Sequence, residues 1–380
     1  MPNSSTYAKK HLSSATVRLN KYKLGAAAVI ALVGLSLTGC HSMATKNAPI
    51  AAKADSTSTV SNGIKTIKNI AYGTDTRQQL DIYTPADGQR HPVLIFVYGG
   101  SWQHGKRQTY GFVGKQFAKS GYTTVVVDYR LAPANVFPDY VLDTASAMGW
   151  VYRNIAQYGG NPNQLFVMGH SAGAFNVVSA VDDSRFWKTI GIPNKAILGV
   201  IGLAGPYDYD FRSGTTKVAF PADSTRQQVM PVYHIRQGVP PHFLVTGSKD
   251  TLVYPQNADS LQKALTQAGG NVERVQVPAT HAGIVIGLAT PLQSFYPTFN
   301  KVNDFMQRHL PTAQWEKFPR KNLKLANFSE QRNPMHTTAK PVASNAIREL
   351  KPSWVNRLGL HFYAIIYAIY SPIFAVIFTA

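Results

Sequence analysis

The chain has 380 residues, 44% of them hydrophobic, and a formal net charge of +19. This length and apolar content indicate a mostly globular protein of one large or two ordinary domains, and exclude a largely disordered chain. Residues 1–39 contribute five of the net positive charges and residues 315–380 contribute six, and no basic stripe interleaved with aromatic residues lies between them. The charge distribution therefore argues against a nucleic-acid-binding protein.

The N-terminus has the layout of an export signal. Five basic residues, the last of them Lys23, precede an apolar run from Leu24 to Leu37 that is short for a membrane-spanning helix. The sequence then reads LTGC, which resembles a bacterial lipobox, where a peptidase cuts before a lipid-modified cysteine. Cys40 is the only cysteine in the chain, so an internal disulfide is excluded.

We therefore predict a lipoprotein signal peptide over residues 1–39 and lipidation at Cys40, with an ordinary signal peptide or an uncleaved anchor as the alternative. Acyl chains on Cys40 would hold the protein in a lipid bilayer of the bacterial cell envelope. Residue 41 is His, not the Asp that resembles an inner-membrane retention signal, which favours the outer membrane. Residues 40–62 are small and polar, and predict a flexible tether.

From residue 64 to about residue 310 the pattern alternates between strands and helices. Strands are predicted at 64–72, 79–83, 93–98, 123–127, 165–168, 196–203, 242–246 and 272–277, and helices at 107–120, 140–158, 172–180, 255–268 and 295–309. Continuous apolar strands separated by helices predict a mostly parallel sheet with helices on both faces. Residues 63–312 are therefore predicted to form one α/β domain.

A serine stands between two glycines in GHSAG, at the junction of a predicted strand and a predicted helix. A strand that turns directly into a helix needs a tight bend, and Gly169 and Gly173 lack the Cβ that would prevent it. The bend would present the Ser171 hydroxyl at a helix N-terminus, where free N–H groups favour negative charge. This is the pattern of a nucleophilic serine. The alternative is a turn of small residues with an incidental serine.

Other chemical groups follow other strands, at the sheet edge where reactive residues of parallel sheets lie. The sequence YGGSW, residues 98–102, follows one strand, and its paired glycines suit an oxyanion hole built from backbone N–H groups. Asp250 follows the strand that ends at residue 246, and His281 follows the strand that ends at residue 277. Asp208 follows an earlier strand and is the rival for the acid. The order Ser171, Asp250, His281 indicates a catalytic triad.

Residues 64 to about 310 resemble the α/β-hydrolase carboxylesterases, near the hormone-sensitive-lipase and kynurenine-formamidase-like branches. The resemblance rests on YGGSW, DYRLAP, GGNPNQLFVMGHSAG, TGSKDTLV and THAGI. It implies the α/β-hydrolase fold and a serine hydrolase acting on small-molecule esters, with no metal and no cofactor. The family's usual HGG is YGG here, which puts only a supporting hydrogen bond in doubt, because the oxyanion donors are backbone groups.

Within this interpretation the backbone N–H groups of Gly100, Ser101 and Ala172 form the oxyanion hole. Trp102 is either a wall of the acyl pocket or a core residue. Residues 207–240 are either a small cap over the site or a long loop. Two other functions remain open: an amidase or peptidase of the same fold, for example arylformamidase-like, and a non-catalytic surface lipoprotein.

The C-terminal region divides into a basic linker over residues 313–357 and a hydrophobic segment over residues 358–380. The 23 residues of this segment are enough to span a bilayer. Basic residues precede it, however, on what would be the non-cytoplasmic side of an exported protein, against the positive-inside rule. A membrane span and an association with the membrane surface therefore both remain open, and the sequence predicts no oligomeric state.

Overall fold

The computed structural model describes residues 57–212, 214–290 and 292–311. The predicted signal peptide, Cys40, the basic linker and the hydrophobic C-terminal segment lie outside the described residues. Within these ranges no helix combines the length and the apolar character that crossing a bilayer requires.

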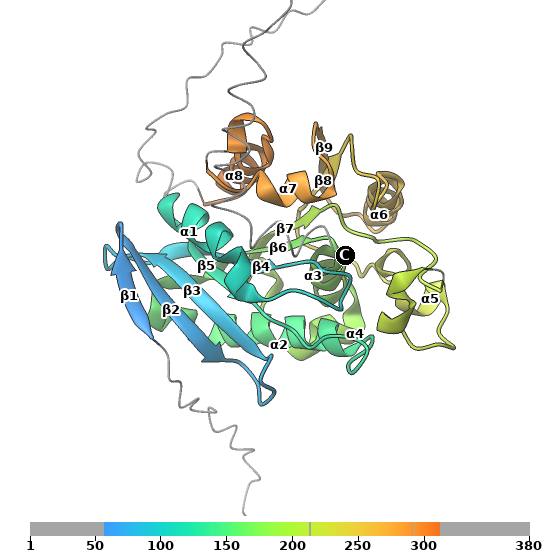
Figure 1. The fold of residues 1–380 in the computed structure, drawn as a ribbon, viewed down its shortest axis with the longest axis horizontal. Helices are drawn as coiled ribbons and strands as arrows, with labels where there is room; N and C mark the ends of the chain where they lie inside the picture. The colour runs from blue at the N-terminus through green and yellow to red at the C-terminus, as the bar shows by residue number, and fades with distance from the viewer. Residues whose placement is uncertain (1–56, 213, 291, 312–380) are drawn as a thin grey trace, which may run out of the picture. The chain divides into compact units, whose positions relative to one another are not determined.

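The described residues are built on one sheet of nine strands (Figure 1). The order across the sheet is β1-β2-β3-β5-β4-β6-β7-β8-β9. Strands β1, β2, β3 and β5 pair antiparallel, and all pairs from β5 to β9 are parallel. The strands are β1 Ser58–Ser61, β2 Ile64–Ala71, β3 Gln79–Pro85, β4 His91–Val97, β5 Thr123–Val127, β6 Gly160–His170, β7 Ile197–Leu203, β8 His242–Gly247 and β9 Val272–Val277.

The central strands are parallel because their sequences suit burial on both faces. Every residue of β4 and of β5 is buried, and so are the last seven residues of β6. Such continuous apolar strands need helices on both sides of the sheet. By contrast β2 has both buried and exposed residues, as an antiparallel strand near an edge does.

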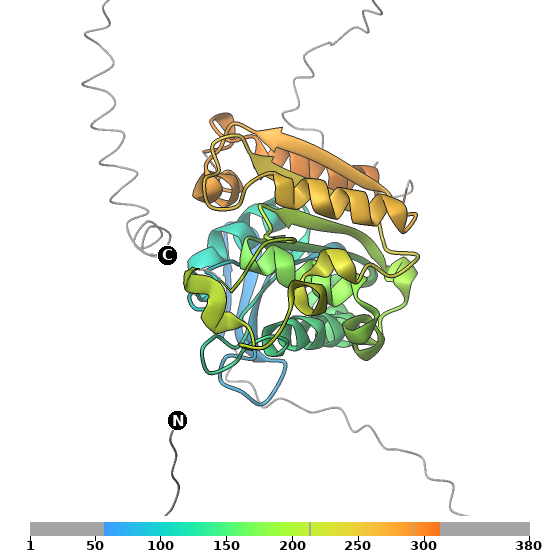
Figure 2. The ribbon, with the colours of Figure 1, turned by 90° about the vertical axis from the view of Figure 1, so that its right-hand side faces the viewer.

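Helices cover both faces of the sheet (Figure 1). Helices α1 and α8 lie on one face, where Phe117 and Phe299 pack with ring centroids 5.1 Å apart, and α2, α3 and α4 lie on the other. Figure 2 turns the molecule so that α6 and the segment around α5 face the viewer. The α-helices are α1 Gly111–Lys119, α2 Asp139–Asn154, α3 Ala172–Asp182, α4 Ser184–Ile190, α5 Arg226–Val229, α6 Gln256–Gln267, α7 His281–Ile286 and α8 Thr298–Arg308.

This architecture confirms the predicted α/β class and the mostly parallel sheet, with local differences. The predicted helix at 107–120 begins as the 3-10 helix η1, Arg107–Tyr110, before α1. Helices α4, α5 and α7 were not predicted. The segment interpreted as a tether overlaps the sheet, because β1 pairs with β2. A polar four-residue strand at a sheet edge carries no hydrophobic period, so the sequence pattern could not reveal it.

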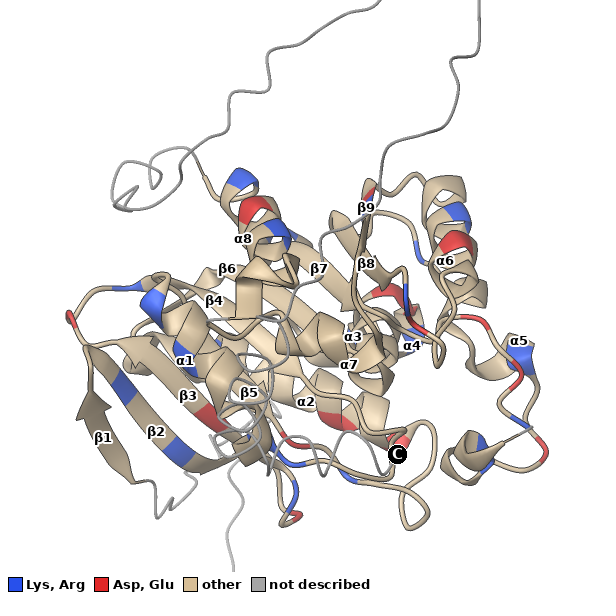
Figure 3. Ribbon diagram, turned by 45° about the horizontal axis from the view of Figure 1, so that its top comes forward, with Lys and Arg blue, Asp and Glu red and all other residues tan. Residues whose placement is uncertain are grey.

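Charges of both signs are interspersed on the outer helices (Figure 3). On α8, Lys301, Asp304 and Arg308 alternate in sign, and on α6 Asp259 precedes Lys263 by four residues. Such mixed surfaces are typical of solvated helices.

Candidate active site

The serine of GHSAG lies at the turn between β6 and α3. Ser171 has φ 54° and ψ −125°, a strained conformation for a residue with a side chain. Its N–H donates to the carbonyl of Leu203 on β7 at 2.8 Å. The neighbouring strand therefore holds the turn in place, and Ser171 stands at the carboxyl end of β6, as predicted.

The two glycines of the motif allow the close approach that the sequence predicts. A Cβ on Gly169 would lie 2.2 Å from the carbonyl oxygen of Gly173, and a Cβ on Gly173 would lie 2.1 Å from that of Val97. These distances are far below van der Waals contact, so neither position accommodates a side chain. The ends of β4 and β6 and the start of α3 thus pack backbone to backbone beside Ser171.

Asp250 and His281 meet where β8 and β9 end. His281 Nδ1 lies 2.8 Å from Asp250 Oδ2, and Asp250 Oδ1 accepts hydrogen bonds from the N–H groups of Leu252 and Val253, each at 2.9 Å. The Asp250 side chain is fully buried, whereas 13% of the His281 side chain is exposed. The carboxylate is therefore fixed and shielded, while the imidazole can still be reached by a reactant.

The surroundings of Asp250 favour its charged form. Burial by itself would raise the pKa of Asp250, but the hydrogen bonds from His281 and from the N–H groups of Val253 and Leu252 outweigh burial and hold the pKa below its usual value. Asp250 is therefore ionised at neutral pH. An ionised carboxylate at Nδ1 selects the imidazole tautomer whose Nε2 can accept a proton.

Asp208, the rival acid, has a different partner. It forms an ion pair with Arg226, and its N–H donates to Asn257 Oδ1 at 3.0 Å. The structure thus brings Asp250, and not Asp208, to His281. Among the described residues no hydrogen bond joins the Ser171 hydroxyl to His281, a contact that in such sites often tightens only when substrate binds.

Two of the predicted oxyanion residues, Gly100 and Ser101, lie in the loop between β4 and η1. Gly100, Ser101 and Trp102 have φ of 128°, 54° and 60°. A Cβ on Gly99 would lie 2.7 Å from Ser171 Cβ, which places the loop directly against the candidate nucleophile.

In the described residues, the backbone N–H groups predicted to form the oxyanion hole have no backbone acceptor. Within the described part of the chain, no backbone carbonyl accepts from the N–H groups of Gly100 or Ser101. The N–H of Ala172 belongs to the first turn of α3, which has no partner inside the helix. These three N–H groups are therefore available to bind a negatively charged oxygen.

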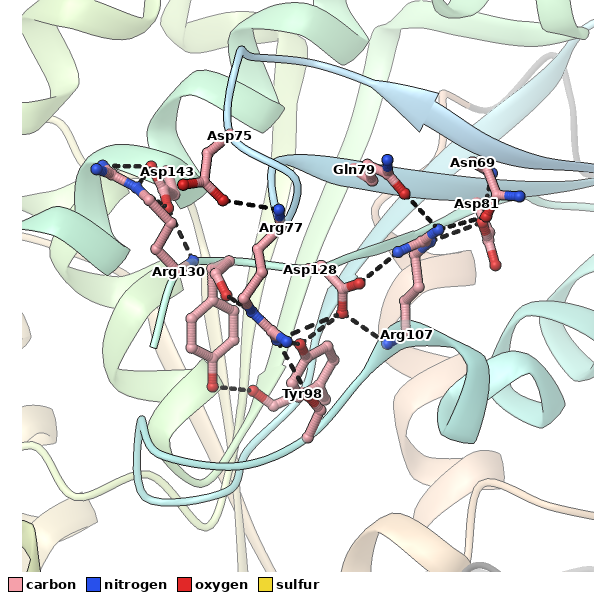
Figure 4. A network of polar contacts seen from close by, with 12 residues as sticks. Asn69, Asp75, Arg77, Gln79, Asp81, Tyr98, Arg107, Asp128, Arg130 and Asp143 are labelled. Carbon is pink, nitrogen blue, oxygen red and sulfur yellow. Dashed lines mark hydrogen bonds and ion pairs between the residues drawn. The ribbon is translucent and has the colours of Figure 1, made fainter. Parts of the chain in front are cut away.

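Sequence reasoning missed the polar network that anchors this loop (Figure 4). The Tyr98 hydroxyl, at the start of the loop, donates to Asp128 Oδ1 at 2.5 Å, and the N–H of Arg107, at its end, donates to the same oxygen at 2.7 Å. The Arg107 side chain also bonds Asp128 and Asp81. One carboxylate therefore closes the loop at both ends.

Arg77 reinforces this closure from the connection between β2 and β3. Its Nη2 donates to the Tyr98 hydroxyl at 2.7 Å and to the carbonyl of Gly105 at 3.0 Å. The signal that could have revealed the network is the presence of Asp81 inside an otherwise buried strand, because a buried charge requires a partner. The tyrosine that replaces the family's histidine in HGG thus makes hydrogen bonds of its own.

Trp102 belongs to the core. Its side chain is 1% exposed, and its indole N–H donates to Asn176 Oδ1 on α3 at 2.9 Å. The indole packs against Tyr140, Phe175 and Phe220, with ring centroids 5.0–5.6 Å apart. These contacts favour the packing role over a wall of the acyl pocket, and they tie the tip of the oxyanion loop to the helix that follows Ser171.

Residues 207–240 are a folded segment and not an open loop. They contain η4 Thr215–Ala219, α5 and η5 Pro231–Tyr233, and the Phe211 and Phe220 rings pack 4.4 Å apart. Gln103 in the oxyanion loop donates to the carbonyl of Thr215 at 3.1 Å. The segment therefore packs beside the oxyanion loop.

Ser171 lies on the strand–helix turn after β6, Asp250 follows β8 and His281 follows β9. This arrangement on a mostly parallel sheet is that of the α/β-hydrolase fold. In the part of the chain that the structure describes, no group of three or more His, Cys, Asp or Glu side chains is placed to hold a metal ion. Two family models match: the BD-FAE model over residues 80–186 and the prolyl oligopeptidase family model over residues 143–312.

Within that fold class the chain is similar to carboxylesterases. It is 29% identical over 219 residues to esterase LipC of Mycobacterium tuberculosis, which covers 52% of this chain and 54% of the relative. It is 35% identical over 150 residues to the probable isoprenylcysteine alpha-carbonyl methylesterase ICME of Oryza sativa subsp. japonica, covering 38% and 36% of the two chains. The chain thus spans about half the length of curated relatives such as LipC.

Solved esterase structures share the fold. Esterase B from Lactobacillus rhamnosis superimposes with a TM-score of 0.56 at 18% identity, covering 68% of this chain and 90% of that one. Esterase 2 from Thermogutta terrifontis gives a TM-score of 0.54 at 22% identity, covering 67% and 95%.

Proposed function

We propose that this protein is a serine hydrolase that cleaves carboxylic esters through an acyl-enzyme intermediate. The observation that carries the proposal is the pairing of His281 with a buried, ionised Asp250 at the same sheet edge as Ser171. The likeness to esterases over about half the chain supports it.

The proposed reaction begins at the substrate carbonyl. The Ser171 oxygen attacks the carbonyl carbon while His281 Nε2 takes the hydroxyl proton, and Asp250 stabilises the resulting imidazolium. The carbonyl oxygen becomes an oxyanion, which the N–H groups of Gly100, Ser101 and Ala172 bind. When the C–O bond to the alcohol breaks, His281 returns the proton to the leaving oxygen. Water then repeats these steps on the acyl-serine and regenerates the free hydroxyl.

A second candidate is amide or peptide cleavage by the same residues. The match of the prolyl oligopeptidase family model to residues 143–312 supports it, because the same triad and oxyanion hole can transfer either acyl group. A binding protein that keeps the fold without catalysis is a third candidate. The pairing of His281 with a buried carboxylate supports catalysis over binding, because a binding site has no need of an oriented base.

We further propose that the protein is tethered to the bacterial cell envelope, in the outer membrane, through an acylated Cys40. The support is in the sequence: a basic region, a 14-residue apolar run at 24–37 and LTGC with the sole cysteine.

The activity is tested with the full chain against p-nitrophenyl acetate, butyrate and longer esters, beside arylamides and aryl formamides. Ester turnover that disappears in Ser171→Ala, together with labelling of Ser171 by a fluorophosphonate, is the expected result. Arylamide or formamide turnover well above ester turnover would favour the second candidate. Neither turnover nor labelling would favour the binding protein.

A further inference from the structure

His170, the residue before the candidate nucleophile, has no part in the triad, yet its side chain reaches the candidate base. It is the last residue of β6 and only 5% exposed. Its Nε2 lies 3.1 Å from the backbone carbonyl oxygen of His281. A carbonyl oxygen can only accept, so the proton of the neutral imidazole is on Nε2. Nδ1 is then unprotonated, and it is buried with no hydrogen-bond partner among the described residues.

This hydrogen bond joins two loops that follow non-adjacent strands of the sheet. Ser171 follows β6 and His281 follows β9, and β7 and β8 lie between these strands. The loop of His281 is joined to the loop of the acid, by Lys249 N–H to the Ala279 carbonyl at 3.1 Å and by the contact of His281 with Asp250. In the described part of the chain, the bond from His170 is the only hydrogen bond between residues 169–173 and residues 278–286.

The His170 ring also fills the space between the oxyanion loop and the base. It packs on the His281 ring with centroids 4.9 Å apart and an interplanar angle of 42°. A Cβ on Gly99 would lie 3.3 Å from His170 Nδ1. A shift of this ring would therefore displace its neighbours at the nucleophile, at the oxyanion loop and at the base.

The imidazole of His170 stays neutral while it fills this place. Burial, and next the charge that His281 carries when protonated, lower the pKa of His170 to about 3, although the nearby Asp250 acts in the opposite sense. A second positive charge beside the imidazolium that forms at His281 is thus avoided, and the single donor on Nε2 is retained.

We propose that His170 is a positioning residue for the hydrolysis proposed above: its Nε2–H holds the backbone of His281 at the distance from Ser171 that proton transfer requires. The inference rests on the proposed function. Asp250 orients the His281 ring, and His170 fixes the position of the His281 backbone from which that ring extends. A displacement of about 1 Å in such a pair can cost roughly 10²-fold in rate.

The test compares two substitutions in the full chain. His170→Leu removes the donor, and His170→Gln keeps an N–H the same number of bonds from Cβ. We expect kcat for a p-nitrophenyl ester to fall by roughly 10- to 100-fold in His170→Leu, with KM changed by less than about threefold, and His170→Gln to recover most of the loss. The rate of fluorophosphonate labelling at Ser171 should fall and recover in parallel. If His170→Leu does not fold, His170→Asn, whose amide is one bond shorter, replaces it.

His309 provides the matched control. Its Nδ1 lies 2.9 Å from the carbonyl oxygen of Phe305, and its ring packs 4.2 Å from the Phe305 ring, at the end of α8. His309→Leu should leave kcat and the labelling rate unchanged. Wild-type activity in folded His170→Leu, or equal losses in folded His170→Leu and His170→Gln, would overturn the proposal. A wild-type chain that neither hydrolyses esters nor reacts with the fluorophosphonate would instead refute the proposed function.

Discussion

At Asp250 the two carboxylate oxygens have different tasks. Oδ1 accepts two backbone N–H groups and shapes its own loop, and Oδ2 binds His281. Because both oxygens are hydrogen-bonded and the side chain is buried, its geometry is fixed before any reaction begins. Asp208, paired with a half-exposed arginine, lacks both features.

The two carboxylates should therefore respond differently to loss of charge. Asp250→Asn should lower kcat by about 10⁴, because the amide no longer selects the tautomer with the proton on Nδ1. Asp208→Asn breaks a partly exposed ion pair, which contributes at most about 1 kcal/mol to stability, and should change kcat little. Steady-state kinetics of the two variants decide between them, and the opposite ranking would identify Asp208 as the acid.

The buried His170 also links stability to pH. The pKa of His170 in the folded chain is about 3, below the value of 6.5 expected when unfolded. As the pH falls below about 6.5 the unfolded chain therefore binds a proton that the folded chain does not. The contribution of His170 to the free energy of unfolding is fully present above this pH. Below it, the contribution falls by up to about 1.4 kcal/mol for each pH unit.

His170→Gln cannot take up this proton, so its free energy of unfolding should fall less steeply between pH 6.5 and 4. Urea unfolding at several pH values measures the two slopes. Equal slopes for wild type and His170→Gln would contradict the assignment of a neutral, buried His170.

At the scale of the element, hydrogen bonds hold the oxyanion loop at both ends and at its tip. Asp128 binds both ends of the loop, and the indole of Trp102 bonds Asn176 at its tip. The positive φ angles of Ser101 and Trp102 are costly for residues with side chains, and such strain persists only where the surroundings enforce it.

Removing one anchor should loosen the loop without removing its donors. Burial and the nearby Asp128 raise the pKa of Tyr98, so its hydroxyl stays protonated and donates. Tyr98→Phe should lower kcat, though by less than the roughly 10²–10³ that loss of an oxyanion donor costs, and should weaken binding of a trifluoromethyl ketone in proportion. The free energy of unfolding should fall by about 1.5–3 kcal/mol.

Tyr110→Phe is the control for this prediction. The Tyr110 ring stacks on Tyr98, with centroids 5.1 Å apart and planes 3° apart, and its hydroxyl makes no hydrogen bond with any described residue. Its loss should leave both kcat and inhibitor binding unaffected. If the two variants behave alike, the Tyr98 hydroxyl does not position the loop.

At the scale of the whole molecule, the described domain is joined to N- and C-terminal segments that the sequence relates to membranes. A diacylated cysteine anchors a protein strongly, since each buried CH₂ contributes about 0.8 kcal/mol. Cys40→Ala should therefore abolish incorporation of labelled palmitate and move the protein from the membrane fraction to the soluble one. Its specific activity on a soluble ester should be retained, because Cys40 precedes the first strand. Palmitate labelling that persists in Cys40→Ala would refute lipidation at this residue.

The sequence alone predicted the fold class, the elbow and the order of the three candidate triad residues, because each leaves a local pattern. Buried parallel strands are continuous apolar runs, and a strand–helix turn needs Gly169 and Gly173 at fixed positions. The strands and the elbow depend on residues that are close together along the chain, and each triad residue follows directly after a strand recognisable in this way.

Only the tertiary structure decided which groups meet. The order along the chain already favoured Asp250 over Asp208 as the acid, but the hydrogen bonds of Asp128 to both ends of one loop and the hydrogen bond from His170 to the backbone of His281 join residues whose contact no sequence pattern indicated. A single sequence carries no signal for such contacts, because they arise from the order of strands in the sheet and from the packing of side chains, not from any local period.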